Sequence, residues 1–200
     1  MKKIVLVVTL SACVALSATS IEKDCNKGDF ASCTLAGKMY EFGVGAKKDF
    51  AKSAQFYKKA CDGNDYEACS NLGTLYSEGQ GEGVKQDSKK AIKLYTKACD
   101  GGYAAGCSNL GVMYSRGQGV EKDFVKAAAY FRRACDAGYW DGCGRFGAIR
   151  YAAFDDKQKA VEYFKKACEL GKNSDEIGGI LEGESEQPWQ HWCDKYDALR

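Results

Sequence analysis

The sequence YKKACDGNDYEACSNLGTLY, residues 57–76, recurs as YTKACDGGYAAGCSNLGVMY at residues 95–114. Each copy places two cysteines eight positions apart, around a short turn that contains glycine. The first cysteines of such pairs recur about every 36 residues along the chain. A fixed period in this range is the signature of stacked supersecondary units, so the sequence predicts a repeat protein.

Each unit is predicted to be a pair of helices. In the first helix, apolar residues three positions apart form a helical stripe. Because glycine in a helix interior costs about 1 kcal/mol relative to alanine, a glycine that recurs there indicates that a neighbouring helix passes too close for a side chain. Such a glycine follows the second cysteine by four positions in every unit, at Gly37, Gly73, Gly111 and Gly147.

A tyrosine and a glycine-rich turn end the first helix of the first three units. These segments are Tyr40 to Gly45, Tyr76 to Gly81 and Tyr114 to Gly119. Glycines at such positions are typical of a left-handed helix stop. They do not match a phosphate-binding loop, because they lack the spacing and the lysine of that motif and follow no predicted strand.

The second helix of each unit begins at an aspartate twelve residues before the next cysteine, where a carboxylate can cap the first turn. These aspartates are Asp49, Asp87, Asp123 and Asp156. The helix ends in a basic residue, alanine and cysteine, and a cation there suits the negative end of the helix dipole. An aromatic residue stands four positions before the cysteine, at Tyr57, Tyr95, Phe131 and Phe164.

The last part of the chain departs from this pattern. Arg150 replaces the tyrosine in the fourth unit, and its loop lacks the glycines. Residues 174–182 are a weak candidate for the first helix of a fifth unit, and residues 189–199, after Pro188, are predicted to form an amphipathic cap, as expected where an array must shield its last apolar face. The predicted domains are a signal peptide over 1–20, a repeat region over 21–183 and a capping helix over 184–200.

The cysteine pairs are predicted to be structural disulfides. Antiparallel helices joined by a tight turn can bring two Cα atoms within the roughly 4.4 to 6.8 Å that a disulfide needs. Spacing alone leaves the connectivity open, but local pairing is favoured because it repeats with the unit. The predicted bridges are Cys25–Cys33, Cys61–Cys69, Cys99–Cys107 and Cys135–Cys143, with the remaining Cys168 and Cys193 expected to tie the last regular helix to the cap.

Other roles for these cysteines fit the sequence less well. A structural zinc site usually needs cysteines two to four residues apart or nearby histidines, and the chain has one histidine, His191. A catalytic thiol would need a histidine partner. His191 lies near Cys193 in sequence, but a surface residue of the cap is the favoured interpretation. We therefore expect no metal and no cofactor.

The first residues have the features of a secretory signal. Two lysines precede an apolar run from Ile4 to Leu16, which is too short for a membrane span of about 20 residues. Leu10 to Cys13 resembles the lipobox of bacterial lipoproteins, so a lipoprotein acylated at Cys13 is an alternative to ordinary cleavage near residues 17–20. We expect a secreted or periplasmic protein, in an oxidising compartment where most of the eleven cysteines can pair.

The repeated motifs resemble a known family. The apolar-Gly-x-apolar-Tyr pattern, the Gly-x-Gly turn and the following aspartate are similar to the Sel-one-like repeat, an αα relative of the tetratricopeptide repeat. The added cysteine pair resembles the Helicobacter cysteine-rich protein family of secreted proteins. This resemblance covers about residues 25–171 and implies an all-α fold: a right-handed superhelical solenoid of four to five repeats, with one disulfide per repeat and a concave groove.

The resemblance also implies penicillin binding and slow β-lactam hydrolysis, because members of that family are often labelled β-lactamases. A serine β-lactamase needs a Ser-x-x-Lys element and two further motifs. Ser20-Ile-Glu-Lys23 is the one match to the first element, and it lies beside the predicted cleavage region. Ser70-Asn71 and Ser108-Asn109 resemble the second only superficially, and the histidines of a metallo-β-lactamase are absent. No catalytic nucleophile can be assigned from the sequence.

Three hypotheses for function remain. The favoured one is a monomeric binding scaffold, because repeat arrays present extended concave surfaces to a peptide, a cell-wall fragment or a host protein. The second is a weak β-lactam hydrolase, and the third is a purely structural secreted antigen. The net charge of +2, spread over the chain, gives no support for nucleic-acid binding. The candidate groove residues are Tyr40, Asn71, Tyr76, Asn109 and Tyr114, although the tyrosines could equally pack between repeats.

Overall fold

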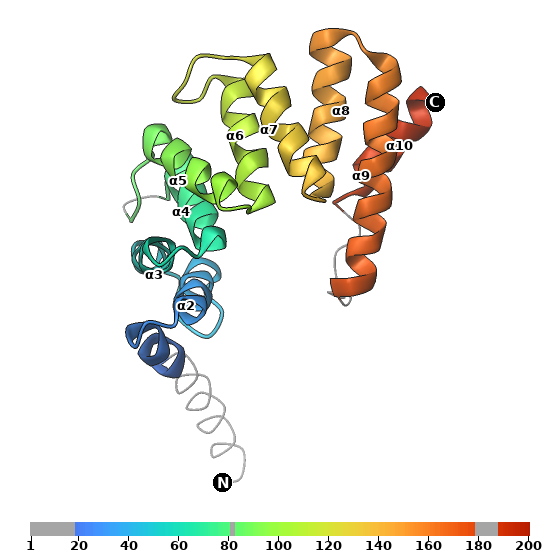
Figure 1. Ribbon diagram of the computed structural model, residues 1–200. Coiled ribbons are helices and arrows are strands. Elements are labelled where there is room, and N and C mark those ends of the chain that lie inside the picture. The colour runs from blue at the N-terminus through green and yellow to red at the C-terminus, as the bar shows by residue number, and fades with distance from the viewer. Residues whose placement is uncertain (1–18, 81–82, 179–187) are drawn as a thin grey trace. The chain divides into compact units, whose positions relative to one another are not determined.

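The computed structural model describes residues 19–80, 83–178 and 188–200 (Figure 1). In this part of the chain the regular elements are all helices, together with one isolated antiparallel bridge between Gln80 and Val84. The predicted all-α repeat fold is therefore confirmed. The predicted signal peptide and Cys13 lie outside the described residues, except for residues 19 and 20, which begin a helical segment that ends at residue 26.

The helices pair into four αα repeats, which fall into two compact units that divide after Lys97. The first unit contains repeat 1, α2 (Phe30–Phe42) with α3 (Phe50–Asp62), and most of repeat 2, α4 (Tyr66–Glu78) with α5 (Ser88–Asp100). The second unit contains repeat 3, α6 (Ala104–Arg116) with α7 (Phe124–Asp136), and repeat 4, α8 (Trp140–Phe154) with α9 (Lys157–Gly178), followed by α10 (Gln190–Leu199).

The recurring glycine and the recurring aromatic residue are the two halves of one contact inside each repeat. A Cβ atom added at Gly73 would lie 2.7 Å from the ring of Tyr95, and one added at Gly111 would lie 2.6 Å from the ring of Phe131. The same arrangement joins Gly37 to Tyr57 and Gly147 to Phe164. The glycine thus lets the first helix rest directly on a buried aromatic ring of the second helix, which confirms the predicted close approach.

The predicted helix starts are also confirmed. The carboxylate of each predicted cap accepts a hydrogen bond from the backbone amide three residues on, at Asp49, Asp87, Asp123 and Asp156. Gly43 and Gly117 end α2 and α6 in the left-handed conformation, as the sequence indicates, and Gly79 also has a positive φ of 70°.

Five disulfides hold the hairpins together. In each repeat junction a cysteine in the last turn of one helix bonds to a cysteine in the first turns of the next, and Cys168 in α9 bonds to Cys193 in α10. The four local bridges are Cys25–Cys33, Cys61–Cys69, Cys99–Cys107 and Cys135–Cys143. All ten half-cystines are buried, so the bridges form part of the core.

Two of the basic residues that precede an Ala-Cys pair bond to the preceding repeat. Lys97 donates from Nζ to the carbonyl oxygen of Cys61 at 2.6 Å, and Arg133 donates from Nη2 to the carbonyl oxygen of Cys99 at 2.8 Å. The residue after the second cysteine also bridges to the following repeat, because Thr34 donates to Asp65 and Ser108 donates to Asp141. These bonds join consecutive repeats within each unit.

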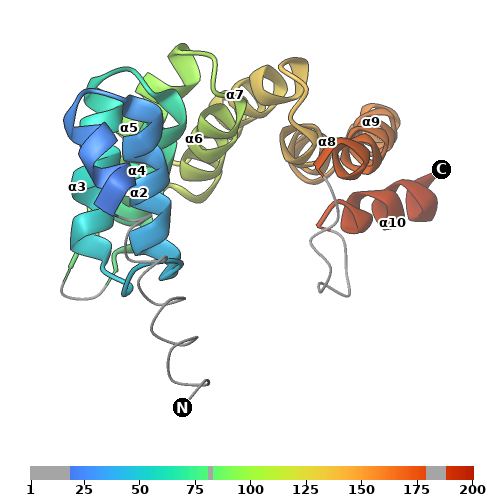
Figure 2. The same ribbon diagram turned by 90° about the horizontal axis from the view of Figure 1, so that it is seen from below.

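Repeat 4 ends differently from the others. The predicted fifth first helix over 174–182 is wrong for residues 174–178, because α9 runs without a turn from Lys157 to Gly178, and residues 179–182 lie outside the described part. The helix therefore continues past the point after Cys168 where the earlier repeats turn. The cap is present as α10, which packs beside α9 in both views (Figures 1 and 2).

Trp192 of α10 covers the end of the second unit. It is 8% exposed and stacks on Phe164, with ring centroids 5.8 Å apart. A Cβ atom added at Gly144 would lie 2.2 Å from the indole, so glycine is required where the other repeats have threonine or serine. Within the described residues, none of the helices combines the length and the apolar character that crossing a membrane would require.

Candidate functional site

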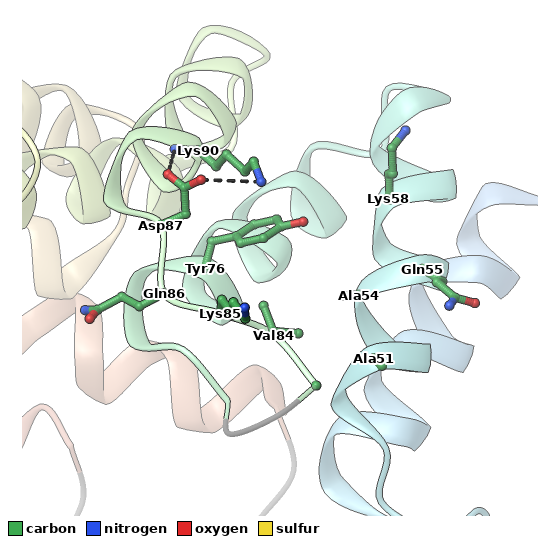
Figure 3. Close-up of a pocket in the computed structure, with 11 residues that line it drawn as sticks. Ala51, Ala54, Gln55, Lys58, Tyr76, Val84, Lys85, Gln86, Asp87 and Lys90 are labelled. Atoms are coloured by element: carbon green, nitrogen blue, oxygen red, sulfur yellow. Dashed lines mark hydrogen bonds and ion pairs between the residues drawn. The ribbon is translucent and has the colours of Figure 1, made fainter.

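The first unit contains a pocket between repeats 1 and 2 that encloses about 590 Å³ (Figure 3). One wall is the exposed face of α3, and the other is the end of α4 with the loop that leads into α5. This volume lies within the range of roughly 300 to 1,000 Å³ that is typical of small-ligand sites. The lining residues are Ala51, Ala54, Gln55, Lys58, Tyr76, Gly83, Val84, Lys85, Gln86, Asp87 and Lys90.

The described residues of the loop after α4, 79–80 and 83–87, shape this pocket. Gln86 donates from its side-chain amide to the carbonyl oxygen of Ser77. The backbone amide of Gln80 donates to the carbonyl oxygen of Val84. Val84 is buried, at 5% exposure. A Cβ atom on Gly83 would lie 3.2 Å from the backbone nitrogen of Ala51, so the loop rests on the start of α3.

Tyr76 stands at the centre of the site, with its ring between the loop and α3 (Figure 3). The Nζ atom of Lys90 lies 5.1 Å from the centre of the ring, which is within the range of a cation–π contact. The same lysine pairs with Asp87 at 3.4 Å. The Lys90 backbone amide, followed by its side chain and charge, holds the pKa of Asp87 below its usual value, so this carboxylate stays charged.

Three lysines make the pocket cationic. Lys58, Lys85 and Lys90 line it, against the single carboxylate of Asp87. Lys58 forms an exposed ion pair with Asp62 one turn along α3. Lys85 is exposed and has no ion-pair partner among the residues that the structure describes. The site can therefore offer positive charge beside an aromatic ring and the small apolar side chains of α3.

The other two predicted groove tyrosines are placed differently. Tyr40 stacks on Phe56 with centroids 5.6 Å apart, and its hydroxyl donates to Glu22. That hydrogen bond, with partial burial, raises the pKa of Tyr40 to about 12. Tyr114 stacks on Tyr130 at 5.5 Å. Both rings pack on the second helix of their own repeat, and neither lines the pocket at Tyr76.

The two predicted asparagines also lie outside this pocket. Asn71 and Asn109 are half-buried at equivalent positions in α4 and α6. Of the five candidate groove residues, Tyr76 alone lines the pocket, and a groove role for the other four stays a prediction. The loop and α3 residues of the pocket were missed by sequence reasoning, although the second loop is visibly longer than those of repeats 1 and 3.

A second pocket, of about 550 Å³, lies in the second unit between α8, α9 and α10. Its lining is mainly apolar and includes Tyr151, Phe164 and Leu199. His191 is at its edge, on the exposed side of α10 beside Trp192, rather than next to a free thiol, because Cys193 is bonded to Cys168. This hollow is therefore a space around the cap, and it has no charged cluster like that of the first pocket.

The residues considered for hydrolysis do not form a site in the described structure. Ser20 and Lys23 are exposed on the first helical segment, and neither lines a pocket described here. Ser70 and Ser108 are buried between helices. Within the described residues, no group of three or more histidine, cysteine, aspartate or glutamate side chains could hold a metal ion.

Comparison with known proteins gives consistent results for the fold. The family model of the Sel1 repeat matches residues 31–65, 67–103, 104–139 and 146–172, more than half of the chain. A Sel1 repeat protein from Oxalobacter formigenes is 26% identical, with a TM-score of 0.70, over 94% of this chain and 80% of that one. The comparison with curated proteins gave no match.

Two further solved structures are similar. A protective antigen of uropathogenic Escherichia coli with an SLR fold is 25% identical, with a TM-score of 0.72, over 91% of this chain and 41% of that one. The cysteine-rich protein B of Helicobacter pylori is 35% identical, with a TM-score of 0.48, over 65% of this chain and 95% of that one.

Proposed function

We propose that this chain, which belongs to the Sel1 repeat family, is an extracytoplasmic binding scaffold that takes a peptide segment of a partner at the Tyr76 pocket. The observation that carries the proposal is this pocket, formed where the loop of repeat 2 rests on α3 of repeat 1. Repeat arrays commonly use the surfaces between neighbouring units for recognition. The pocket is open to solvent on α3 and needs no rearrangement to admit a ligand side chain.

An extracytoplasmic location is supported by the cysteine chemistry. Five disulfides are present, and reduced thiols are the normal state of cysteines in the cytosol. Secretion or residence in the periplasm, after removal of residues 1–20 or acylation of Cys13, is the finer form of this proposal. We expect the protein to act as a monomer, because each unit has its own stapled core.

The scaffold role is favoured over hydrolysis by the state of the candidate catalytic groups. The ten cysteines that the structure describes are in disulfides, and the serines next to asparagine, Ser70 and Ser108, are buried. The Tyr76 pocket, by contrast, has the mixture of aromatic, amide and charged groups that orients a bound peptide. Tyr40 and Asn71 are proposed as further groove residues of the first unit, and Asn109 and Tyr114 as groove residues of the second.

A random peptide library displayed on phage tests the proposal on the purified, oxidised full chain. We expect enriched peptides to bind with micromolar Kd and to lose at least tenfold in affinity when Tyr76→Ala removes the ring from the pocket. Tyr151→Ala, which removes an exposed tyrosine from the second unit, is the control and should leave Kd unchanged. The proposal fails if no peptide is enriched, or if affinity follows Tyr151 and not Tyr76.

A further inference from the structure

We infer that the Tyr76 pocket selects acidic peptide segments, with the carboxylates of aspartate or glutamate side chains held by Lys85 and Lys90. This inference rests on the proposed function, because it names the chemistry of the peptide that the same pocket takes. Neither the fold nor the family of the chain fixes the charge of the ligand. The side chains that line this one pocket therefore determine which ligand charge it accepts.

The charge of the lining favours an anion. Among the described lining residues there are three lysines, Lys58, Lys85 and Lys90, and one carboxylate, Asp87. The carboxylate, Asp87, is already committed, because it accepts hydrogen bonds from the first turn of α5 and pairs with Lys90. A ligand carboxylate would meet Lys85, which has no ion-pair partner in the described part of the chain, and would share Lys90 with Asp87.

The existing ion pairs do not block this exchange. Lys58 and Asp62 are 67% and 63% exposed, and the Lys90 side chain is 59% exposed. Exposed pairs of this kind contribute little stability, since both ions remain largely hydrated. Solvent screens the attraction between a lysine and a carboxylate less when the carboxylate is held against an aromatic ring and backbone walls than when both ions are on the surface. The lysines can therefore turn toward a ligand at small cost.

The remaining lining favours a peptide over a small inorganic anion. The amide side chain of Gln55 both donates and accepts hydrogen bonds, which matches a peptide group. Ala51, Ala54 and Val84 offer small apolar contacts, and the ring of Tyr76 can stack on a planar or apolar ligand side chain. A free phosphate would satisfy the lysines and leave these surfaces uncovered. The combination fits a short chain segment with alternating acidic and apolar residues.

The experiment uses two fluorescein-labelled peptides, Ala-Glu-Tyr-Glu-Ala and its isostere Ala-Gln-Tyr-Gln-Ala, with fluorescence anisotropy on the oxidised full chain. We expect the acidic peptide to bind at least tenfold more tightly, and its affinity to fall as salt is raised. Lys85→Glu and Lys90→Glu should each reduce the affinity at least tenfold. Lys93→Glu makes the same change of charge on α5 outside the pocket and should have less than a twofold effect.

The outcomes separate the inference from the function on which it rests. Equal binding of both peptides, still lost in Tyr76→Ala, would overturn the acidic selectivity while the peptide-binding pocket stood. Absence of binding by either peptide, together with a failed library selection, would overturn both. An equal loss in Lys93→Glu, or full competition by inorganic phosphate, would show general attraction of anions and would also overturn the inference. Circular dichroism checks that each variant is folded.

Discussion

Repeats 2 and 4 differ in how the chain turns from the first helix of the repeat to the second. In repeat 2 the chain leaves α4 at Gly79, makes a long loop over residues 79–87, and closes with a hydrogen bond from the Asp87 amide to the Tyr76 carbonyl oxygen at 2.7 Å. In repeat 4, α8 continues to Phe154, and the equivalent bond runs from Asp156 to Arg150 at 2.9 Å.

The side chains explain why one turn is open and the other closed. In repeat 2 the cation over the tyrosine comes from the second helix, so the ring keeps one face toward α3 of repeat 1. In repeat 4 the cation is in the first helix: the guanidinium of Arg150 donates to Asp156 and lies 4.9 Å from the centre of the Phe154 ring. The same repeat framework thus carries an open pocket beside repeat 2 and a closed turn in repeat 4.

The largest effect is expected from removing the bridge that closes repeat 4. Cys168→Ser with Cys193→Ser should lower the free energy of unfolding by about 3.5 kcal/mol, because this bridge closes a longer chain segment than the local bridges do. The matched double variant at Cys61 and Cys69 in repeat 2 should lower it by about 2.5 kcal/mol.

Urea denaturation with tryptophan fluorescence measures both values. Loss of the terminal bridge should also shift the emission of Trp192 to longer wavelength before global unfolding, since the indole is held on Phe164 by α10. A larger loss of unfolding free energy in the double variant at Cys61 and Cys69 than in the one at Cys168 and Cys193 would contradict this prediction.

A medium effect is expected at the glycine–aromatic contacts. Gly73→Ala places a methyl group 2.7 Å from the Tyr95 ring, which is itself bonded to Thr74, so the ring cannot move away freely. Overpacking of about 1 to 3 kcal/mol should exceed the gain of about 1 kcal/mol in helix propensity. Gly147→Ala meets Phe164 at 3.0 Å and should cost about 1 kcal/mol less. Thermal denaturation measures the difference, and equal Tm values would contradict it.

The smallest effect is expected on substitution of Asp87 and Asp156, which cap the second helices of repeats 2 and 4, and this effect depends on pH. The hydrogen bond from Arg150, followed by that from the Lys159 amide, holds the pKa of Asp156 below its ordinary value of 3.8. Because the folded pKa is lowered, the stabilisation is present above pH 3.8 and is lost as the pH falls through the folded value.

Asp156→Asn keeps an acceptor for the amide but removes the charge that pairs with Arg150. We therefore expect a larger drop in Tm at pH 7 than for Asp87→Asn, whose pKa is lowered chiefly by a backbone amide. The difference between the two variants should disappear once the pH has fallen below the folded pKa values of both wild-type carboxyls, where neither carboxyl is charged. A difference that persisted there would mean that shape, not charge, distinguishes the two turns.

Much of the fold could be predicted from the sequence because its determinants are local. The resemblance to Sel-one-like repeats is confirmed by the family model, which matches four stretches of the chain, and by the Oxalobacter formigenes structure. The cap at Asp49 and the helix stop at Gly43 depend on residues within one turn of each other. The recurring glycine predicted a close neighbour, but only the structure identified that neighbour as the aromatic residue of the same repeat.

The predictions that failed or fell short depend on less local effects. Residues 174–182 were a weak candidate for a separate helix, but α9 continues to Gly178 although Gly171, Asn173 and Ser174 are residue types that favour a turn. The pocket residues Gln55, Val84 and Lys85 come together because an elongated loop folds back on the preceding repeat. No periodic pattern in the sequence indicates that contact. Tyr76 was therefore predicted as a groove residue from its position in the repeated motif, whereas the residues around it in the pocket were not predicted.

Gly144 has a consequence for how such proteins change length. In repeats 1 and 3 this position holds the hydroxyl of Thr34 or Ser108, which bonds to the next repeat, whereas the missing side chain in repeat 4 admits the indole of Trp192. Duplication of repeat 1 or 3 would therefore keep this hydroxyl at the new junction, while a new repeat appended after repeat 4 would first have to displace the tryptophan and restore the hydroxyl. We therefore expect such proteins to gain repeats by internal duplication and not by addition of a repeat after the cap.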